Sequence, residues 1–212
     1  DALRMKRFEI SIVMEGGALE INSQGVCLTT QQCLLNKNRN PDLTQSEIER
    51  YLEDYLGVKE FIWLGKGLEG DKTDGHIDTI TRFANDTSIV TSICEDKNDT
   101  NYAPLQENLE VLMSARQANG DPYKLIKLPL PKKRVDLSGE RLPLTYANFY
   151  IGNGFVVVPL YDDVHDGRAL SILQTAFPQR RVIGLPSTGL ITGGGSFHCV
   201  TQQYPRGDIY RG

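Results

Sequence analysis

The 212-residue sequence has no apolar run close to the roughly 20 residues that a membrane-spanning helix needs. Its opening stretch, DALRMKRFEI, also lacks the apolar centre of a signal peptide. Neither charge forms a block, because 23 Lys and Arg residues are interspersed with 27 Asp and Glu residues, for a net charge of -4. A nucleic-acid-binding face needs clustered positive charge. These absences predict a cytoplasmic protein without a membrane or nucleic-acid partner, and they are compatible with small cationic partners.

Cysteine is also scarce, with four residues in the chain. None of them forms a CxxC pair or has a histidine at ligand spacing, so no structural metal site is expected. Cys27, Cys33 and Cys94 lie within apolar stretches and are interpreted as small buried hydrophobic residues. Cys199 differs, because it follows the glycine-rich residues 193–196 (GGGS), where a ligand can approach closely. We interpret Cys199 as a candidate nucleophile, the alternative being a fourth buried thiol.

The order of predicted elements repeats along the chain. The first unit has strand-like residues 18–22 and 25–30, a helix after the capping box of Thr44 and Glu47, and a strand at 58–64. The second unit has strands at 77–83 and 88–94, a helix from Pro104 and a strand at 123–130. The third has strands at 145–151 and 155–161, a helix at 167–177 and a strand at 180–185. A fourth unit has one strand, at 196–203. This order predicts an α/β repeat fold of about three ββαβ units plus one strand.

Polar residues mark the starts of these units. Glu15, His76 and Cys199 are separated by about one and two repeat lengths, so units arranged around an axis would bring them together at its centre. His76 and Asp78 are two residues apart and would share one face of a strand, although an exposed loop is an alternative. Glu15 precedes two glycines at an expected strand end, where a buried carboxylate needs a partner. We predict His76 as that partner, and an exposed turn is the alternative for Glu15.

Two other histidines are given no role in this interpretation. His198 adjoins Cys199, but neighbouring residues of a strand point to opposite faces, so His198 is predicted to be a poor partner for the thiol. His165 lies between two aspartates and is interpreted as a solvated residue at a helix start. The general acid or base is therefore expected to be His76.

Four segments of the sequence together resemble the agmatine deiminases, which are close relatives of the bacterial peptidylarginine deiminases. These segments are MEGGALEINSQGVCLTTQQCLLNKNRNP, WLGKGLEGDKTDGHIDTITRF, TYANFYIGNG and GGGSFHCVTQQYP. The resemblance implies a pentein fold, a five-bladed α/β propeller of ββαβ modules around a central active site. Residues 1–212 would then be the C-terminal portion of a single catalytic domain, with an N-terminal segment of the same protein expected to complete it.

The resemblance also implies roles for individual residues. Cys199 resembles the nucleophile, His76 the general acid and base, Glu15 the carboxylate that orients it, and Asp78 a carboxylate that binds the guanidinium. The family's second guanidinium-binding aspartate has no match in residues 1–14. The implied reaction converts agmatine to N-carbamoylputrescine and ammonia through a covalent thiouronium and requires neither metal nor cofactor. A peptidylarginine deiminase, a catalytically silent pentein module and a homo-oligomer all remain open.

Overall fold

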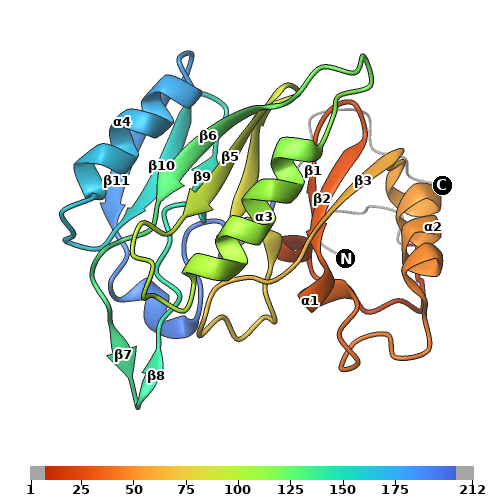
Figure 1. Ribbon diagram of the computed structural model, residues 1–212, viewed down its shortest axis with the longest axis horizontal. Coiled ribbons are helices and arrows are strands. Elements are labelled where there is room, and N and C mark those ends of the chain that lie inside the picture. The colour runs from red at the N-terminus through yellow and green to blue at the C-terminus, as the bar shows by residue number, and fades with distance from the viewer. Residues whose placement is uncertain (1–7, 204–212) are drawn as a thin grey trace.

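The computed structural model describes residues 8–203 and contains three small mixed sheets, each with an antiparallel and a parallel strand pair (Figure 1). The first sheet has strands β1 (Glu20–Ile21), β2 (Val26–Thr30) and β3 (Glu60–Leu64), with helix α2 (Gln45–Leu56) in the crossover. The second has β4 (Thr81–Asn85), β5 (Ser88–Ile93) and β6 (Lys124–Pro129), with α3 (Tyr102–Ser114). The third has β9 (Tyr150–Ile151), β10 (Phe155–Leu160) and β11 (Arg181–Pro186), with α4 (Asp166–Ala176). The predicted ββαβ order is therefore confirmed in all three units.

Shorter elements lie before, within, between and after the three units. They are η1 (Gly16–Ala18), α1 (Gln31–Leu34), η2 (Ile77–Thr79), the hairpin of β7 (Asp136–Leu137) and β8 (Glu140–Arg141), and η3 (Leu190–Gly193). Each of the sheets within residues 8–203 is open, so the α/β class is confirmed while a closed propeller is not seen in this part of the chain. None of the helices in the same range, of which α3 has 13 residues, is long and apolar enough to cross a bilayer.

Local sequence explains the crossover helices. Thr44 and Glu47 form the predicted capping box of α2, and Gly57 ends the helix with a left-handed φ of 68°. The apolar face of this helix buries Ile48 and Leu52. Figure 1 shows α2 and α4 at opposite ends of the molecule, with α3 between them.

The core continues from one unit to the next. Cys27 and Leu28 are adjacent in β2 and point to opposite faces of the sheet, so that Cys27 packs with α2 while Leu28 packs in a cluster that includes Leu105 of α3. Val90 of β5 likewise packs with residues of α4, including Leu173. Because both faces are covered, all five residues of β2 are buried. This packing fixes where each unit begins relative to its neighbours.

The unit starts are where the predicted strands are wrong. Residues 77–79 form the 3₁₀ helix η2, and strand pairing begins only at Thr81. Only Tyr150 and Ile151 of residues 145–151 are in a strand, and residues 196–203 form turns and coil. Hydrogen bonds that involve side chains replace the backbone pairing of strands there. Thr145 Oγ1 donates to Thr79 O, and the backbone amides of Ser196 and Cys199 donate to the Asn148 side chain.

Candidate active site

A cavity of about 750 Å³ opens where the unit starts meet. Glu15, His76 and Cys199, which the repeat spacing predicted to lie together, all contribute to its lining, and so does Asp78. Its wall also includes Glu20, Arg82, Ile151, His198 and residues 201–203. Carboxylate, imidazole and thiol groups from three separate parts of the chain, near residues 15–20, 76–78 and 198–199, therefore line one cavity.

Asp78 is the fully buried carboxylate among the residues that line this cavity. One oxygen, Oδ2, lies 2.6 Å from His198 Nδ1 and accepts a hydrogen bond from Asn148 Nδ2 at 3.0 Å. The other oxygen, Oδ1, has no hydrogen-bond partner within the described residues. Burial favours the neutral acid, but the hydrogen bond and charge of His198, with Arg82 and His76, outweigh it and lower the pKa of Asp78. Asp78 is thus a buried carboxylate with one free acceptor.

Cys199 lies in a turn rather than a strand, and Asn148 holds that turn. The Asn148 side chain donates from Nδ2 to the Cys199 sulfur at 3.1 Å and accepts at Oδ1 from the amides of Ser196 and Cys199, at 3.0 and 3.3 Å. The residue as a whole is exposed, unlike Cys27, Cys33 and Cys94, which are buried as predicted. Its sulfur nevertheless packs 3.5 Å from Asp78 Oδ2. Local burial, followed by the negative charge of Asp78, raises the pKa of the Cys199 thiol to about 11.

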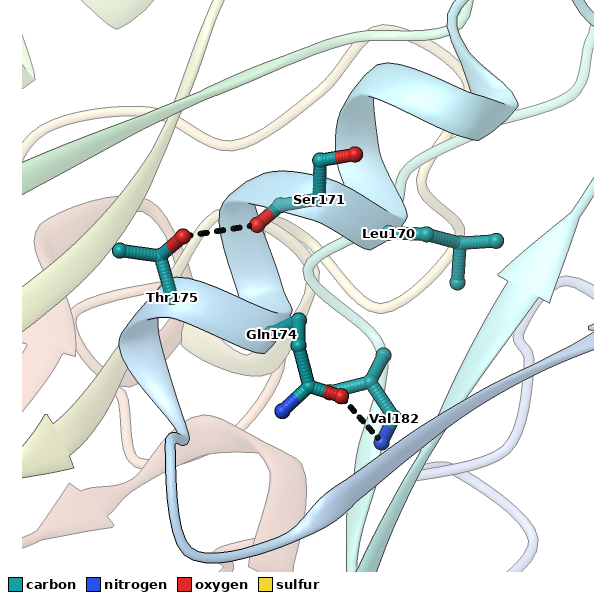
Figure 2. Close-up of a pocket in the computed structure, with 5 residues that line it drawn as sticks. All are labelled: Leu170, Ser171, Gln174, Thr175 and Val182. Carbon is teal, nitrogen blue, oxygen red and sulfur yellow. Dashed lines mark hydrogen bonds between the residues drawn. The ribbon is translucent and has the colours of Figure 1, made fainter.

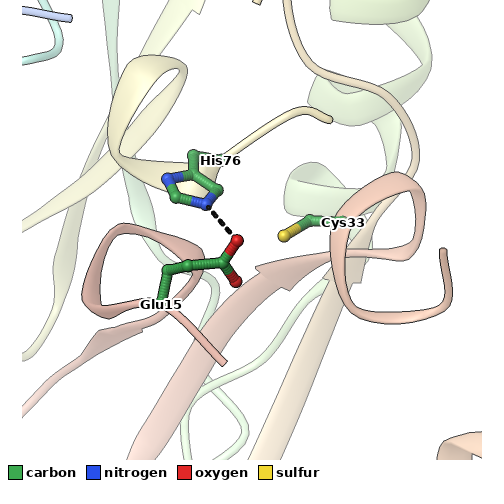
Figure 3. A group of neighbouring side chains, drawn as sticks. All are labelled: Glu15, Cys33 and His76. Atoms are coloured by element: carbon green, nitrogen blue, oxygen red, sulfur yellow. Dashed lines mark ion pairs between the residues drawn. The ribbon is translucent and has the colours of Figure 1, made fainter. Parts of the chain in front are cut away.

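Glu15 precedes η1 rather than ending a strand, and its main partner is Arg39 instead of the predicted His76. Arg39 Nε lies 2.9 Å from both Glu15 oxygens, and Nη2 lies 2.6 Å from Oε1. His76 Nε2 is farther away, 3.7 Å from Glu15 Oε1 (Figure 3). The Arg39 hydrogen bond is the largest cause of the lowered pKa of Glu15. The predicted pairing therefore exists, but as the longer contact of a carboxylate already bound by an arginine.

Glu15, Cys33 and His76 also place one potential metal-ligand atom each within 4.8 Å of one another (Figure 3). Metal binding requires a thiolate and a carboxylate with free lone pairs. Burial raises the pKa of Cys33 to about 12, and Arg39 already binds both oxygens of Glu15. The chemistry of this group therefore fits an ion pair better than a metal centre.

Three functional candidates escaped the sequence interpretation: Asn148, His198 and Arg39. The strand predicted at His198 is wrong, because residues 197–200 form a turn in which His198 Nδ1 lies 2.6 Å from Asp78 Oδ2. That His198 is a poor partner for the thiol stays a prediction. Asn148 could have been noticed, since a polar residue within an apolar segment needs buried partners. His165 does lie at the start of α4 as predicted, but it is half-buried and its Nδ1 lies 2.9 Å from Leu130 O.

A second hollow lies between α4 and β11 and is lined by Leu170, Ser171, Gln174, Thr175 and Val182 (Figure 2). Its polar groups are already used in local structure. The hydroxyls of Ser171 and Thr175 donate to helix carbonyls one turn earlier, and Gln174 Oε1 accepts from the Val182 amide. This hollow has no acid, base or thiol, whereas the cavity around Cys199 combines a thiol with a buried carboxylate that has a free oxygen, and it is therefore the candidate active site.

Comparison with known proteins agrees with this geometry. Residues 1–205 match the family described as Porphyromonas-type peptidyl-arginine deiminase. A Legionella pneumophila (strain Paris) protein, provisionally named an agmatine deiminase, is 42% identical over 200 residues, which cover 94% of this chain and 58% of that protein.

Two solved structures resemble the fold as well. The agmatine deiminase of Enterococcus faecalis, described as catalysing its reaction, superposes with a TM-score of 0.88 at 35% identity, over 92% of this chain and 58% of that one. A cysteine-to-serine variant of C. jejuni agmatine deiminase with substrate bound gives a TM-score of 0.82 at 38% identity, over 89% and 55%. The chain thus spans a little more than half the length of these relatives. On this evidence, the chain belongs to the Porphyromonas-type peptidyl-arginine deiminase family.

Proposed function

We propose that this chain supplies the nucleophile and proton-transfer groups of a deiminase that hydrolyses agmatine to N-carbamoylputrescine and ammonia. The observation that carries this proposal is the free Oδ1 of Asp78, a buried acceptor with no partner in the described residues, beside the Cys199 sulfur. An unpaired buried carboxylate oxygen is costly unless a donor fills the site. A guanidinium is a planar cation that presents N–H donors and leaves its carbon open to attack.

The reaction balances with the groups at hand. The Cys199 thiol first gives its proton to solvent. The thiolate then forms a C–S bond to the guanidinium carbon while the C=N π electrons move to nitrogen, giving a neutral tetrahedral adduct. His76 as imidazolium, with Glu15 beside it, protonates one nitrogen, and ammonia leaves as the C–N bond breaks. The remaining thiouronium is attacked by water that gives its proton to the neutral His76. Breaking the C–S bond returns the thiol and releases the ureido product, and no step calls for a metal or cofactor.

The same proposal assigns the rest of the protein. Three ββαβ units and residues 196–203 would be part of a five-module propeller, and a further segment of the protein would supply a second carboxylate for the guanidinium. The length of the relatives supports this, since the chain covers 58% of the Legionella protein. The far end of the substrate would meet that segment together with the exposed residues Gln202 and Gln203 at the cavity mouth.

Agmatine and peptidyl-arginine substrates can be separated directly. The complete protein is expected to release ammonia and N-carbamoylputrescine from agmatine at about 1 s⁻¹ or faster, within the usual enzyme range. Arginine in a peptide is expected to react at least about tenfold less efficiently, because binding energy from the free amine end is lost. Product analysis by mass spectrometry checks both. A preference for the peptide would favour the alternative named by the family description, and reaction with neither would contradict the proposal.

Gly195 provides a geometric test of the nucleophile. A Cβ at this position would lie 2.7 Å from both Cβ and Sγ of Cys199, so Gly195→Ala must displace the thiol. We expect kcat to fall about 100-fold, since misplacing a reacting group by about 1 Å can cost that much. Gly193→Ala is the matched control, because its Cβ would meet nothing within 4 Å. Equal activity of the two variants would show that the position of this sulfur is not critical.

A further inference from the structure

Arg39 is a buried cation next to the proposed proton-transfer group, yet it does not line the cavity. Its side chain is 6% exposed and pairs with two carboxylates, Glu15 and Asp74. It also donates from Nη2 to the Thr73 carbonyl at 2.8 Å and from Nη1 to Asn38 Oδ1 at 3.1 Å. These contacts join the segment before η1 to the loop that leads into His76. The residue is therefore placed to act on His76 through other groups, without touching the substrate.

The charges around His76 give that placement a consequence. The groups near its ring or backbone are Glu15, Cys33, Arg39, Asp71, Asp74, Asp78, His198 and Cys199. Glu15 lies 3.7 Å from the ring, and Arg39 is the cation that binds Glu15 and Asp74 directly. Without Arg39 the Glu15 carboxylate beside the ring and the Asp74 carboxylate, which also interacts electrostatically with His76, would lose their paired cation. An imidazolium would then be held too firmly to release its proton.

We propose that Arg39 is a positioning residue that holds Glu15 beside His76 and offsets enough of its charge for His76 to both donate and accept a proton. The inference rests on the proposed function, which uses His76 first as an acid and then as a base. A bidentate arginine suits this role, because its fixed fork orients a carboxylate as well as neutralising it. Arg39 lies 24 positions from Glu15 in sequence and 35 from Asp74, so it also fastens three segments at the cavity wall.

The test measures the titration midpoint of the His76 imidazole in the complete protein without ligand. Its imidazole NMR signals, identified by their loss in His76→Gln, are followed against pH in wild type, Arg39→Met, Arg39→Gln and Arg39→Lys. The titration midpoint is expected to rise by about one pH unit in the Met and Gln variants, because uncompensated carboxylate charge favours the imidazolium. Lysine keeps the charge and is expected to restore most of the midpoint. Two neutral variants are included so that one remains if circular dichroism shows the other unfolded.

Arg141→Met is the matched control. Arg141 is also a shielded arginine, 12% exposed in its side chain, that pairs with two carboxylates, Glu69 and Asp99, away from the cavity. Its loss is expected to leave the His76 midpoint unchanged. With agmatine, Arg39→Met should lower kcat about tenfold or more while KM stays within about twofold. An unchanged or lowered midpoint in a folded neutral variant would overturn the role of Arg39. Because the titration needs no substrate, failure to turn over agmatine would contradict the proposed function separately.

Discussion

Cys199→Ser is expected to lower kcat by about 10⁴-fold or more while agmatine still binds, because a neutral serine hydroxyl is a far weaker nucleophile than a thiolate. The substitution is nearly isosteric. It leaves in place the Asn148 contacts that form the turn and the free Oδ1 of Asp78 that we propose receives the guanidinium. Turnover is measured by ammonia release and binding by calorimetry.

Cys94→Ser is the control for this substitution. Cys94 is buried outside the cavity and donates weakly to Asp96 O at 3.5 Å, a contact that a serine hydroxyl can also make. Its kcat is expected to stay within about twofold of wild type, because surface or conservative changes away from the reacting groups have small effects. If Cys199→Ser retained more than about 1% of wild-type kcat, the thiol could not be the nucleophile.

The units of the fold could be predicted because their signals are local. The capping box of Thr44 and Glu47 lies within four residues of sequence, and Gly57 ends the same helix with the φ that glycine accepts most readily. Alternating and continuous apolar stretches likewise predicted both strands of each parallel pair. Such features are decided by neighbours along the chain, so they can be recognised without the fold.

The unit starts could not be predicted, because their conformation depends on distant partners. Asn148 holds both Asp78, 70 positions away, and the turn of Cys199, 51 positions away. Residues 77–79 and 196–203 were predicted to be strands. They are not, because hydrogen bonds that involve side chains take the place of the backbone hydrogen bonds between strands. The four predicted residues still line one cavity, because the repeat places equivalent positions together even when their local conformation is wrong. The catalytic roles assigned to them remain proposals.

Arg39 shows a further limit of reading the sequence. It lies in the polar segment 36–40 (NKNRN), which looks like an ordinary solvated loop. Its partners Glu15 and Asp74 approach it only in the folded chain. The Glu15 carboxylate was correctly expected to need a partner. His76 was predicted to be that partner because only candidate catalytic residues were considered, and Arg39 was not among them. An arginine in a polar loop is therefore easily overlooked, because its carboxylate partners can be identified only in the folded chain.

The two oxygens of Asp78 suggest how substrate and nucleophile are coupled. Oδ2 contacts His198, Asn148 and the Cys199 sulfur, while Oδ1 remains available. With the pKa of the thiol raised to about 11, the empty site holds a neutral sulfur at neutral pH. A guanidinium on Oδ1 would bring positive charge next to the sulfur and cancel part of the field of Asp78. Ionisation of Cys199 would then accompany substrate binding.

Alkylation of Cys199 by iodoacetamide should therefore be slow near neutral pH and rise about tenfold per pH unit between pH 7 and pH 9, a change of about 100-fold, because only the thiolate reacts. The rate is measured on the complete protein by mass spectrometry of the Cys199 peptide. A small guanidinium ion too short to cover the sulfur should accelerate the reaction at pH 7. A rapid rate that stays flat from pH 6 to pH 8 would instead show a standing thiolate.

Asp78→Asn separates this mechanism from simple burial of the sulfur. Burial is the largest cause of the raised pKa of Cys199 and the charge of Asp78 is the next, so removing that charge lowers the pKa while burial persists. We expect alkylation at pH 8 to be about tenfold faster than in wild type, and guanidinium no longer to accelerate it, although agmatine turnover falls at least about 100-fold through loss of the guanidinium contact. Asp86→Asn, which removes a half-buried carboxylate bonded to Ser23 outside the cavity, should change neither rate. Slower alkylation of Asp78→Asn would show that Asp78 activates the thiol directly, since the two measured rates would then fall together instead of moving in opposite directions.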